Sequence, residues 1–275
     1  LVRENKWYYD TFYGMIQTAA VDTNGDGKMY GPDDTFGFAT SDYSSYGLLY
    51  ASGEQFTARD AEDKPVLVSD HERMSRVAEY AAKIMADKER TVITGKQGIS
   101  DSDNLRFVFE EGRSLFFGEV MQCITRMRDS ETAFGLIPWP KFDEGQKDFC
   151  TLIHTTAGKG IVIPASQNNM ELAGAITEAM AAKSMYTLTP AYYNVALTYK
   201  YMRDNESAEM LDIILESRCF DLGLIYAWGG LSSGIHSIIT NGKAENFAST
   251  WEKNATKFDT ALDKTMTAYE ELKNR

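Results

Sequence analysis

The chain has 275 residues, of which 43% are hydrophobic and 25% are charged, the composition of a folded protein with a sizeable core. Its formal net charge of −12 argues against nucleic acid and anionic membranes as partners, because both carry negative charge themselves. No apolar run approaches the length of a membrane span, and no signal peptide is recognisable.

The sequence starts at Leu1 without an initiator Met and runs past Trp7 into an amphipathic pattern. This pattern predicts a helix close to the start of the chain. A start of this kind is typical of an internal segment, so we expect the C-terminal portion of a longer protein.

Residues 22–33 follow this helix and have the spacing of an EF-hand-type calcium loop. Oxygen-bearing side chains recur at the first, third, fifth and twelfth positions, and Gly27 is sixth, where the loop must turn sharply. A surface turn rich in Asp, Asn and Gly that binds no metal is the alternative. The expected Ca²⁺ ligands are Asp22, Asn24, Asp26, the backbone carbonyl of Lys28, and Asp33.

The short aromatic segment 35–40 predicts a strand directly after the loop. A sensor EF-hand pair needs a second helix at this place and usually a second loop, and the sequence has neither. We therefore expect a structural calcium site between a helix and a strand rather than a switch.

Helices and short apolar strands alternate along the rest of the chain, which predicts an α/β architecture. Ser69 and Glu72 form a candidate capping box before one helical stripe, and Asn168 and Glu171 precede another. Further helices are expected at 206–214 and 247–272, and strands at Ser114–Phe117, Phe134–Ile137 and Gly160–Ile163.

The three cysteines, Cys123, Cys150 and Cys219, are odd in number, widely spaced and fit no zinc or redox motif. Apolar residues flank each of them, so we expect three small buried hydrophobic side chains.

Catalytic motifs are weak. Residues 230–234 match the G-x-S-x-G nucleophile elbow, but His236 follows too closely to be the base of that triad. A glycine-flanked turn is the favoured interpretation. A glycosidase stays open as an alternative, because its two carboxylates need not lie in a sequence motif.

Four segments resemble the extracellular solute-binding proteins of bacterial ABC sugar importers, particularly lipoprotein-type members from gut Firmicutes. Residues 109–116 resemble the family's F-x-x-G-x-A-x-F/M segment, and 134–141 its G-x-x-P-x-P-K strand. Residues 160–173 are similar to the next strand and helix start, and 192–223 to a later pattern. The segments keep the family's order over nearly the whole chain.

This resemblance implies a type II periplasmic-binding-protein fold, with two α/β lobes and a sugar in the cleft between them. By this mapping, residues 1–154 and 206–275 build the C-terminal lobe, and 155–205 return to the N-terminal lobe. Most of the first lobe and the lipid-anchored cysteine would then lie outside this chain.

The resemblance also implies where the sugar binds: on the loop after the first strand, directly after strand 114–117, and on a late aromatic segment. For the aromatic residues, ordinary core packing is the alternative. The implied ligand-binding residues are Asp42, Tyr43, Tyr46, Glu119, Tyr226 and Trp228.

We therefore expect an extracellular, surface-attached solute-binding protein without enzymatic activity. It would capture a carbohydrate, an oligosaccharide by preference, and deliver it to the permease subunits of an ABC transporter. Membrane contact would come only through an N-terminal lipid anchor absent from this chain. The alternatives are a secreted carbohydrate-active enzyme and a calcium-loop interaction module of dockerin type, although a dockerin would repeat its loop.

Overall fold

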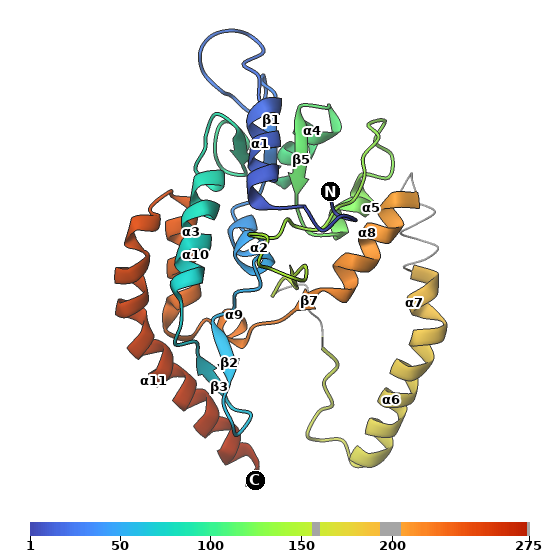
Figure 1. Ribbon diagram of the computed structural model, residues 1–275. Coiled ribbons are helices and arrows are strands. Elements are labelled where there is room, and N and C mark those ends of the chain that lie inside the picture. Colours follow the sequence, from blue (N-terminus) through green and yellow to red (C-terminus); the bar gives the residue numbers. More distant parts are fainter. Residues whose placement is uncertain (156–159, 193–204, 274–275) are drawn as a thin grey trace.

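The computed structural model describes residues 1–155, 160–192 and 205–273 (Figure 1). The part of the sequence resemblance that falls on 193–204 therefore lies outside the described residues. None of the described helices is both long enough and apolar enough to cross a membrane.

A parallel sheet with the strand order β4-β1-β5 organises the upper part of Figure 1. All five residues of the central strand β1 are buried, which agrees with its nearly continuous apolar sequence. The strands predicted at 35–40 and 114–117 are confirmed, whereas β4 was not predicted. Their bounds are β1, Phe36–Thr40; β4, Thr91–Ile93; and β5, Ser114–Gly118.

Helices α1 (Tyr9–Ala19) and α4 (Ser102–Glu110) cover this sheet. Phe12 of α1 meets Phe38 of β1 edge to face, with ring centroids 5.3 Å apart. Ala39, the next residue of β1, belongs instead to a separate apolar cluster that includes the α4 side chains. The helix predicted near the start of the chain is confirmed as α1.

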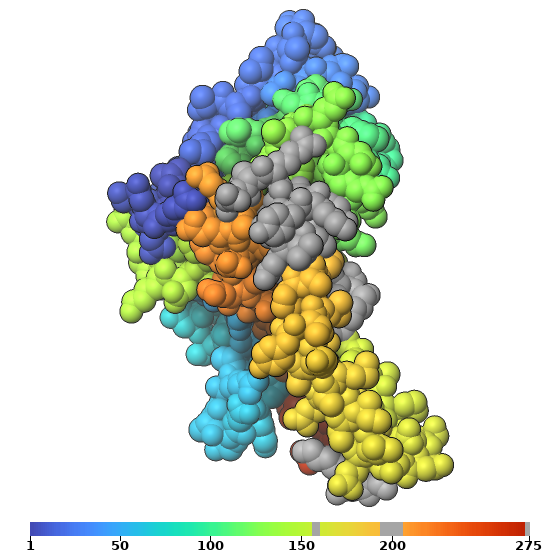
Figure 2. All heavy atoms as spheres, turned by 90° about the vertical axis from the view of Figure 1, so that its right-hand side faces the viewer, coloured from blue at the N-terminus to red at the C-terminus, as the bar shows by residue number. Residues whose placement is uncertain are grey.

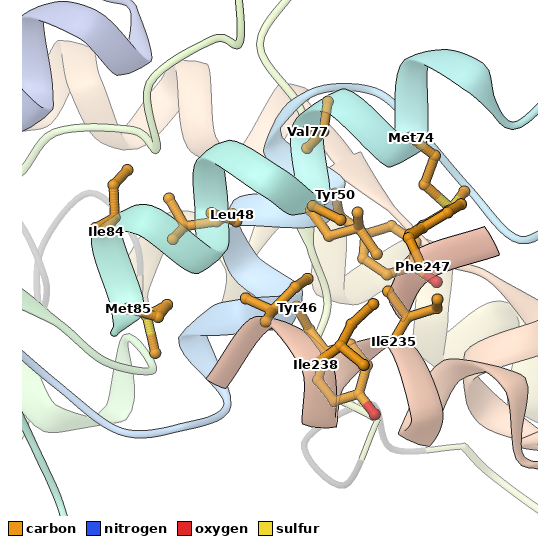
Figure 3. Close-up of a cluster of buried hydrophobic side chains, with 14 of the residues drawn as sticks. Tyr46, Leu48, Tyr50, Met74, Val77, Ile84, Met85, Ile235, Ile238 and Phe247 are labelled. Atoms are coloured by element: carbon orange, nitrogen blue, oxygen red, sulfur yellow. The ribbon is translucent and has the colours of Figure 1, made fainter. Parts of the chain in front are cut away.

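The main hydrophobic core lies between the sheet and a group of packed helices. Figure 3 shows Tyr46 and Tyr50 of α2 among Met74 of α3 and Ile235 of α10. These helices are α2, Ser44–Ala51; α3, Glu72–Met85; α10, Leu231–Thr240; and α11, Phe247–Lys273, which is the long helix predicted at 247–272.

The helix α3 is present, but its predicted capping box is wrong. His71 is the N-cap residue and makes no side-chain capping bond. The carboxylate of Asp70 accepts a hydrogen bond from the backbone N–H of Glu72 at 3.1 Å. Asp70 thus satisfies one of the free N–H groups of the first turn, the role assigned to Ser69.

Short elements connect this framework. β2 and β3 form an antiparallel hairpin, and β6 and β7 form a parallel pair. Their bounds, with those of the small helices, are β2, Thr57–Arg59; β3, Pro65–Leu67; α5, Gln122–Arg126; β6, Thr151–Leu152; α7, Leu188–Pro190; α8, Asn205–Glu216; β7, Arg218–Cys219; α9, Leu222–Ile225.

Helix α6 (Met170–Tyr186) projects from the lower end of the molecule, as its yellow spheres in Figure 2 show. None of its residues is buried, and the predicted apolar stripe is exposed, Ile176 by 50% and Met180 by 63%. Its N-cap is Asn169, whose side chain accepts from Leu172 N, one residue after the predicted Asn168. The division of the chain at 154 and 205 stays a prediction.

Two predicted strands are wrong. Phe134–Ile137 belongs to no strand, and its Leu136 N–H donates to the Ser207 hydroxyl at 2.9 Å instead. Gly160–Ile163 also belongs to no strand, and Val162 is 87% exposed. A short apolar run becomes a strand only when a second strand supplies the ladder of hydrogen bonds.

Candidate binding site at the strand ends

The carboxyl ends of β1 and β5 lie next to each other, because the two strands are parallel and Thr40 pairs with Gly118. The Thr40 hydroxyl donates to the Gly118 carbonyl at 2.7 Å, and the Ser44 hydroxyl donates to the same carbonyl at 3.3 Å. These hydrogen bonds hold the ends of the two strands together, so the segments that follow β1 and β5 begin side by side. In open α/β sheets this edge is where ligands bind.

Tyr43 follows β1 and stacks on His154, with ring centroids 3.8 Å apart and planes inclined by 26°. The Tyr43 hydroxyl lies 3.3 Å from the Thr155 hydroxyl and accepts a hydrogen bond from Thr155 N at 3.3 Å. Strand β6 ends two residues before His154 and so delivers the imidazole to this edge. Tyr43 and His154 are both half-buried, so each keeps an exposed surface.

Tyr46, in the first turn of α2, stacks on His236 of α10 with a centroid separation of 4.8 Å. The Nδ1 atom of His236 lies 2.5 Å from the Ser45 hydroxyl, and its Nε2 atom lies 3.7 Å from a carboxylate oxygen of Asp42. Burial raises the pKa of Tyr46 to about 12, so its hydroxyl stays protonated at neutral pH.

Glu119 is half-buried and directly follows β5. Its carboxylate acts on the pKa of His154, which burial lowers and the negative charge of Glu119 partly restores. The structure thus places Asp42, Tyr43, Tyr46 and Glu119 around two histidines.

Tyr226 and Trp228 lie against α11 instead. Their rings stack at 4.9 Å, the Trp228 indole N–H donates to Thr265 at 2.9 Å, and the Tyr226 hydroxyl lies 2.6 Å from that of Tyr269. Trp228 is 4% exposed and packs as part of the core. For Trp228 this is the packing alternative that the sequence left open, whereas Tyr226 is 41% exposed.

Neither histidine was predicted at this edge: His236 was considered only as a triad base, and His154 was not assigned to a site. His154 follows the apolar run Thr151-Leu152-Ile153, which is a strand signal. A polar residue after a buried parallel strand is a usable indication of a site. For His236 the sequence carries no such signal, because a distant helix brings it to the edge.

No protein-family model and no curated protein matches the chain. Solved structures do match. The Thermus thermophilus maltotriose binding protein bound with maltotriose aligns with a TM-score of 0.58 at 12% identity, over 93% of this chain and 66% of that chain. The maltose/maltodextrin-binding domain MalE from Bdellovibrio bacteriovorus bound to maltotriose aligns with a TM-score of 0.57 at 16% identity, over 92% of this chain and 66% of that chain.

The fold is that of a type II periplasmic-binding protein. The fold class predicted from the sequence is therefore confirmed. At these identities the likeness establishes the fold alone. This chain spans 66% of the length of each neighbour, and both neighbours are binding proteins.

In this periplasmic-binding-protein fold the predicted calcium loop lies at the top of Figure 1, between α1 and β1. Carboxylate oxygens of Asp22 accept hydrogen bonds from the backbone N–H groups of Gly25 and Gly27, at 2.7 and 2.8 Å. Gly25 and Gly27 have φ values of 72° and 79°, a conformation that favours glycine.

At the far end of the loop, two neighbouring carboxylates have different environments. Asp33 is exposed, whereas Asp34 is fully buried and accepts hydrogen bonds from Thr23 N and Tyr30 N at 2.8 and 2.7 Å. The donor set of carboxylate, amide and carbonyl oxygens fits the chemistry of Ca²⁺. Across residues 1–155, 160–192 and 205–273, no three His, Cys, Asp or Glu side chains converge on a metal-sized site.

A groove of about 980 Å³ runs between β3 and α11, away from the strand ends. It is bordered by acidic side chains such as Asp259 and Asp263 beside Leu262 and Met266. Trp251 also lines this groove, but its side chain is only 5% exposed and packs in the main core, so it offers little surface for a ligand to stack on. We therefore place the candidate site at the strand ends.

The two histidines of the site make a pH dependence testable. Burial lowers the pKa of both His154 and His236 below the ordinary value of 6.5. The unfolded chain therefore binds protons more readily than the folded protein does. The free energy of unfolding has its full value above about pH 6.5 and decreases as the pH falls from there through the pKa values of the folded protein. Thermal unfolding between pH 7.5 and 5 should show this fall, and it should be shallower in a double His154→Gln, His236→Gln variant. Equal slopes in the two proteins would contradict the assignment.

Proposed function

We propose that the chain is part of an extracellular solute-binding protein that captures a carbohydrate, an oligosaccharide in particular. The observation that carries this proposal is the cluster of aromatic rings and carboxylates at the carboxyl ends of β1 and β5, in a type II periplasmic-binding-protein fold. The two solved neighbours are bound to maltotriose, which supports a sugar as the ligand.

The chemistry of the cluster suits a sugar. Aromatic rings such as that of Tyr43 stack on the apolar face of a pyranose ring, and carboxylates such as those of Asp42 and Glu119 accept hydrogen bonds from its hydroxyl groups. Asp42 has a side chain exposed by 63% and is therefore reachable from solvent. The neutral imidazole of His236 can either donate or accept, as a hydroxyl-rich ligand requires.

The remaining parts of the proposal concern the cell. The protein would be held at the outer surface of the cell by a lipid anchor and would deliver its ligand to the permease subunits of an ABC transporter. The alignment with 66% of each neighbour leaves one third of those proteins unmatched, so further ligand contacts would come from that part.

An enzymatic role is the alternative that the geometry argues against. Ser45, His236 and Asp42 have the residue types of a catalytic triad, with Ser45 2.5 Å from the imidazole. Ser45 is completely buried, however, and a nucleophile must reach its substrate. Ser232 of the G-x-S-x-G match lies in the first turn of α10 and is 2% exposed, so it is no exposed nucleophile elbow.

The proposal is tested by thermal unfolding against a panel of oligosaccharides at millimolar concentration, with product analysis of the same samples. A ligand that binds only the folded state stabilises it by RT ln(1 + [L]/Kd), about 1.4 kcal/mol at ten times Kd. We expect a higher unfolding midpoint with one class of glycan and no product. Hydrolysis would favour the enzyme, and an unchanged midpoint with every glycan would contradict carbohydrate capture.

Replacing the stacking ring should weaken binding of the glycan identified in this way. For Tyr43→Ala we expect about a tenfold increase in Kd, because aromatic stacking contributes roughly 1 kcal/mol and the supporting hydroxyl is lost as well. Tyr30→Ala is the matched control, since Tyr30 is 46% exposed and lies in the calcium-type loop. Calorimetric titration measures the Kd of the glycan for both variants. If Tyr43→Ala and Tyr30→Ala bind the glycan equally well, Tyr43 is not part of the site.

We also propose that the loop of residues 22–33 binds a structural Ca²⁺ through Asp22, Asn24, Asp26, the carbonyl of Lys28, and Asp33. The exposed position of Asp33 and the buried position of Asp34 make the twelfth ligand the part most in need of a test.

Added Ca²⁺ should raise the unfolding midpoint of the wild-type protein after chelation. Asp26→Asn should abolish this rise, and Asp33→Asn should reduce it. Asp60→Asn is the control, because the Asp60 side chain likewise accepts backbone hydrogen bonds in an exposed turn. If added Ca²⁺ does not change the unfolding midpoint of the wild-type protein, the loop is a turn that binds no metal.

A further inference from the structure

Two of the three cysteines lie together, contrary to the sequence expectation of separate buried side chains. The Sγ atoms of Cys150 and Cys219 are 2.9 Å apart, although the residues are far apart in sequence. Both side chains are half-buried rather than fully enclosed. The contact could not be predicted from spacing, because it depends on the pairing of β6 with β7.

The pairing of these strands fixes the two sulfurs in place. Thr151 N donates to the Ser217 carbonyl at 2.8 Å, and Ile153 N donates to the Cys219 carbonyl at 3.1 Å. The hydroxyls of Thr151 and Ser217 also lie 2.9 Å apart. These hydrogen bonds hold the two strands together on either side of the thiols. The short distance between the two sulfur atoms therefore follows from the pairing of the backbones.

The position in the fold gives the pair its significance. The chain leaves the main body after β6 and returns to it before β7, and the projecting helix α6 lies between them (Figure 1). The pair therefore sits at the base of this excursion. A covalent bond there would join residues 150 and 219 and close everything between them into one ring.

We propose that Cys150 and Cys219 form a redox-sensitive disulfide that locks β6 to β7 at the base of the segment carrying α6. A disulfide needs a sulfur separation of about 2.05 Å, so the sulfurs must approach by only about 0.9 Å. The proposal does not depend on what the protein binds.

The oxidant is a low-molecular-weight disulfide. The Cys150 thiolate attacks one of its sulfurs, forms a mixed disulfide and releases one thiolate. The Cys219 thiolate then attacks Cys150 Sγ and displaces the second. Two protein thiols are thereby oxidised, and one small disulfide is reduced to two thiols. The hydrogen bond between the pair lowers the pKa of Cys150 and raises that of Cys219, which suits Cys150 as the first nucleophile.

Cys123 on α5 serves as an internal control. Burial, together with the nearby charge of Glu119, raises the pKa of its thiol to about 11, so little of it is thiolate at neutral pH. It should remain a free thiol while the other two react.

The test oxidises the purified chain with glutathione disulfide, blocks free thiols with N-ethylmaleimide, and maps the peptides by mass spectrometry without reduction. We expect a peptide linking Cys150 to Cys219 and one maleimide adduct, at Cys123. Cys123→Ser should form the same link, whereas Cys219→Ser should stop at glutathione attached to Cys150. Three maleimide adducts after oxidation, or a link that involves Cys123, would overturn the proposal.

A second readout concerns folding. Closing the ring 150–219 restricts the unfolded chain, so the oxidised wild type should melt several degrees above the reduced protein. A Cys150→Ser, Cys219→Ser double variant replaces sulfur by oxygen and should show no difference between the two conditions. A link that forms and leaves the midpoint unchanged would contradict the locking role.

Discussion

Replacing Asp221 by Ala should destabilise the protein by about 3 kcal/mol or more, the largest effect we expect from any single side chain. Asp221 is the N-cap residue of α9, and its side chain accepts four hydrogen bonds while the residue is only 2% exposed. The donors are the Tyr50 hydroxyl, Phe56 N, the Thr57 hydroxyl and Gly223 N, at 2.5 to 2.7 Å.

Removal of this carboxylate leaves buried donors without partners, and each such group costs its full desolvation penalty. Asp221→Asn should be nearly as harmful, because one oxygen that accepts two hydrogen bonds becomes an NH₂ group that can only donate. Asp212→Ala on the exposed face of α8 is the control and should stay within about 0.5 kcal/mol of the wild type. Denaturant unfolding measures all three, and a loss below 1 kcal/mol for Asp221→Ala would contradict this account.

Gly37→Ala should cost about 3 kcal/mol for a different reason. Gly37 lies in the middle of β1, and a Cβ atom at this position would come within 2.1 to 2.6 Å of the backbone of Ile16 in α1. No rotamer change can relieve a clash with backbone, so helix and strand must separate.

Gly14→Ala is the matched control for this clash. Gly14 lies in α1, and apart from its chain neighbours and the backbone of its own helix no atom lies within 4 Å of a Cβ added there. An alanine inside a helix is favoured over glycine, so this variant should gain about 0.5 to 1 kcal/mol. Relative to the wild type, the free energy of unfolding should fall in Gly37→Ala and rise in Gly14→Ala. Similar changes in the two variants would show that the approach of α1 to β1 is looser than described.

The strand β1, which contains Gly37, is also an example of an element that the sequence predicts well. β1 combines glycine with aromatic residues in a short run, so both its extended conformation and its burial follow from local composition. The helix α3 is a second example, because its apolar stripe is the face that the structure buries. The helix α6 is the exception, since its apolar stripe is exposed.

The failures arise where a distant segment decides the structure. Leu136 is bound by Ser207, and Val162 is exposed by 87%, so neither apolar run becomes a strand. β4 escaped prediction because three residues, Thr91–Ile93, carry too little periodicity. The Cys150–Cys219 contact depends on two strands of two residues each, which are equally short.

The residues of the candidate site divide in the same way, into those that the sequence could indicate and those that depend on distant packing. Asp42 and Glu119 could be named because the resemblance to solute-binding proteins points to the residues that directly follow β1 and β5. His236 could not, since α10 reaches this edge only through the packing of α2, α3 and α10. Trp228 illustrates the reverse case: the resemblance implied a ligand contact with core packing as the alternative, and the side chain is buried against α11.

Hydrogen exchange measured by mass spectrometry, with and without the glycan that raises the unfolding midpoint, tests the central claim most directly. Carbohydrate bound at the carboxyl ends of β1 and β5 should slow exchange in residues 41–46, in 118–121 and around His154. Exchange in the hairpin of β2 and β3 should stay unchanged. Protection along the groove between β3 and α11, with none at the strand ends, would contradict the site proposed for this protein.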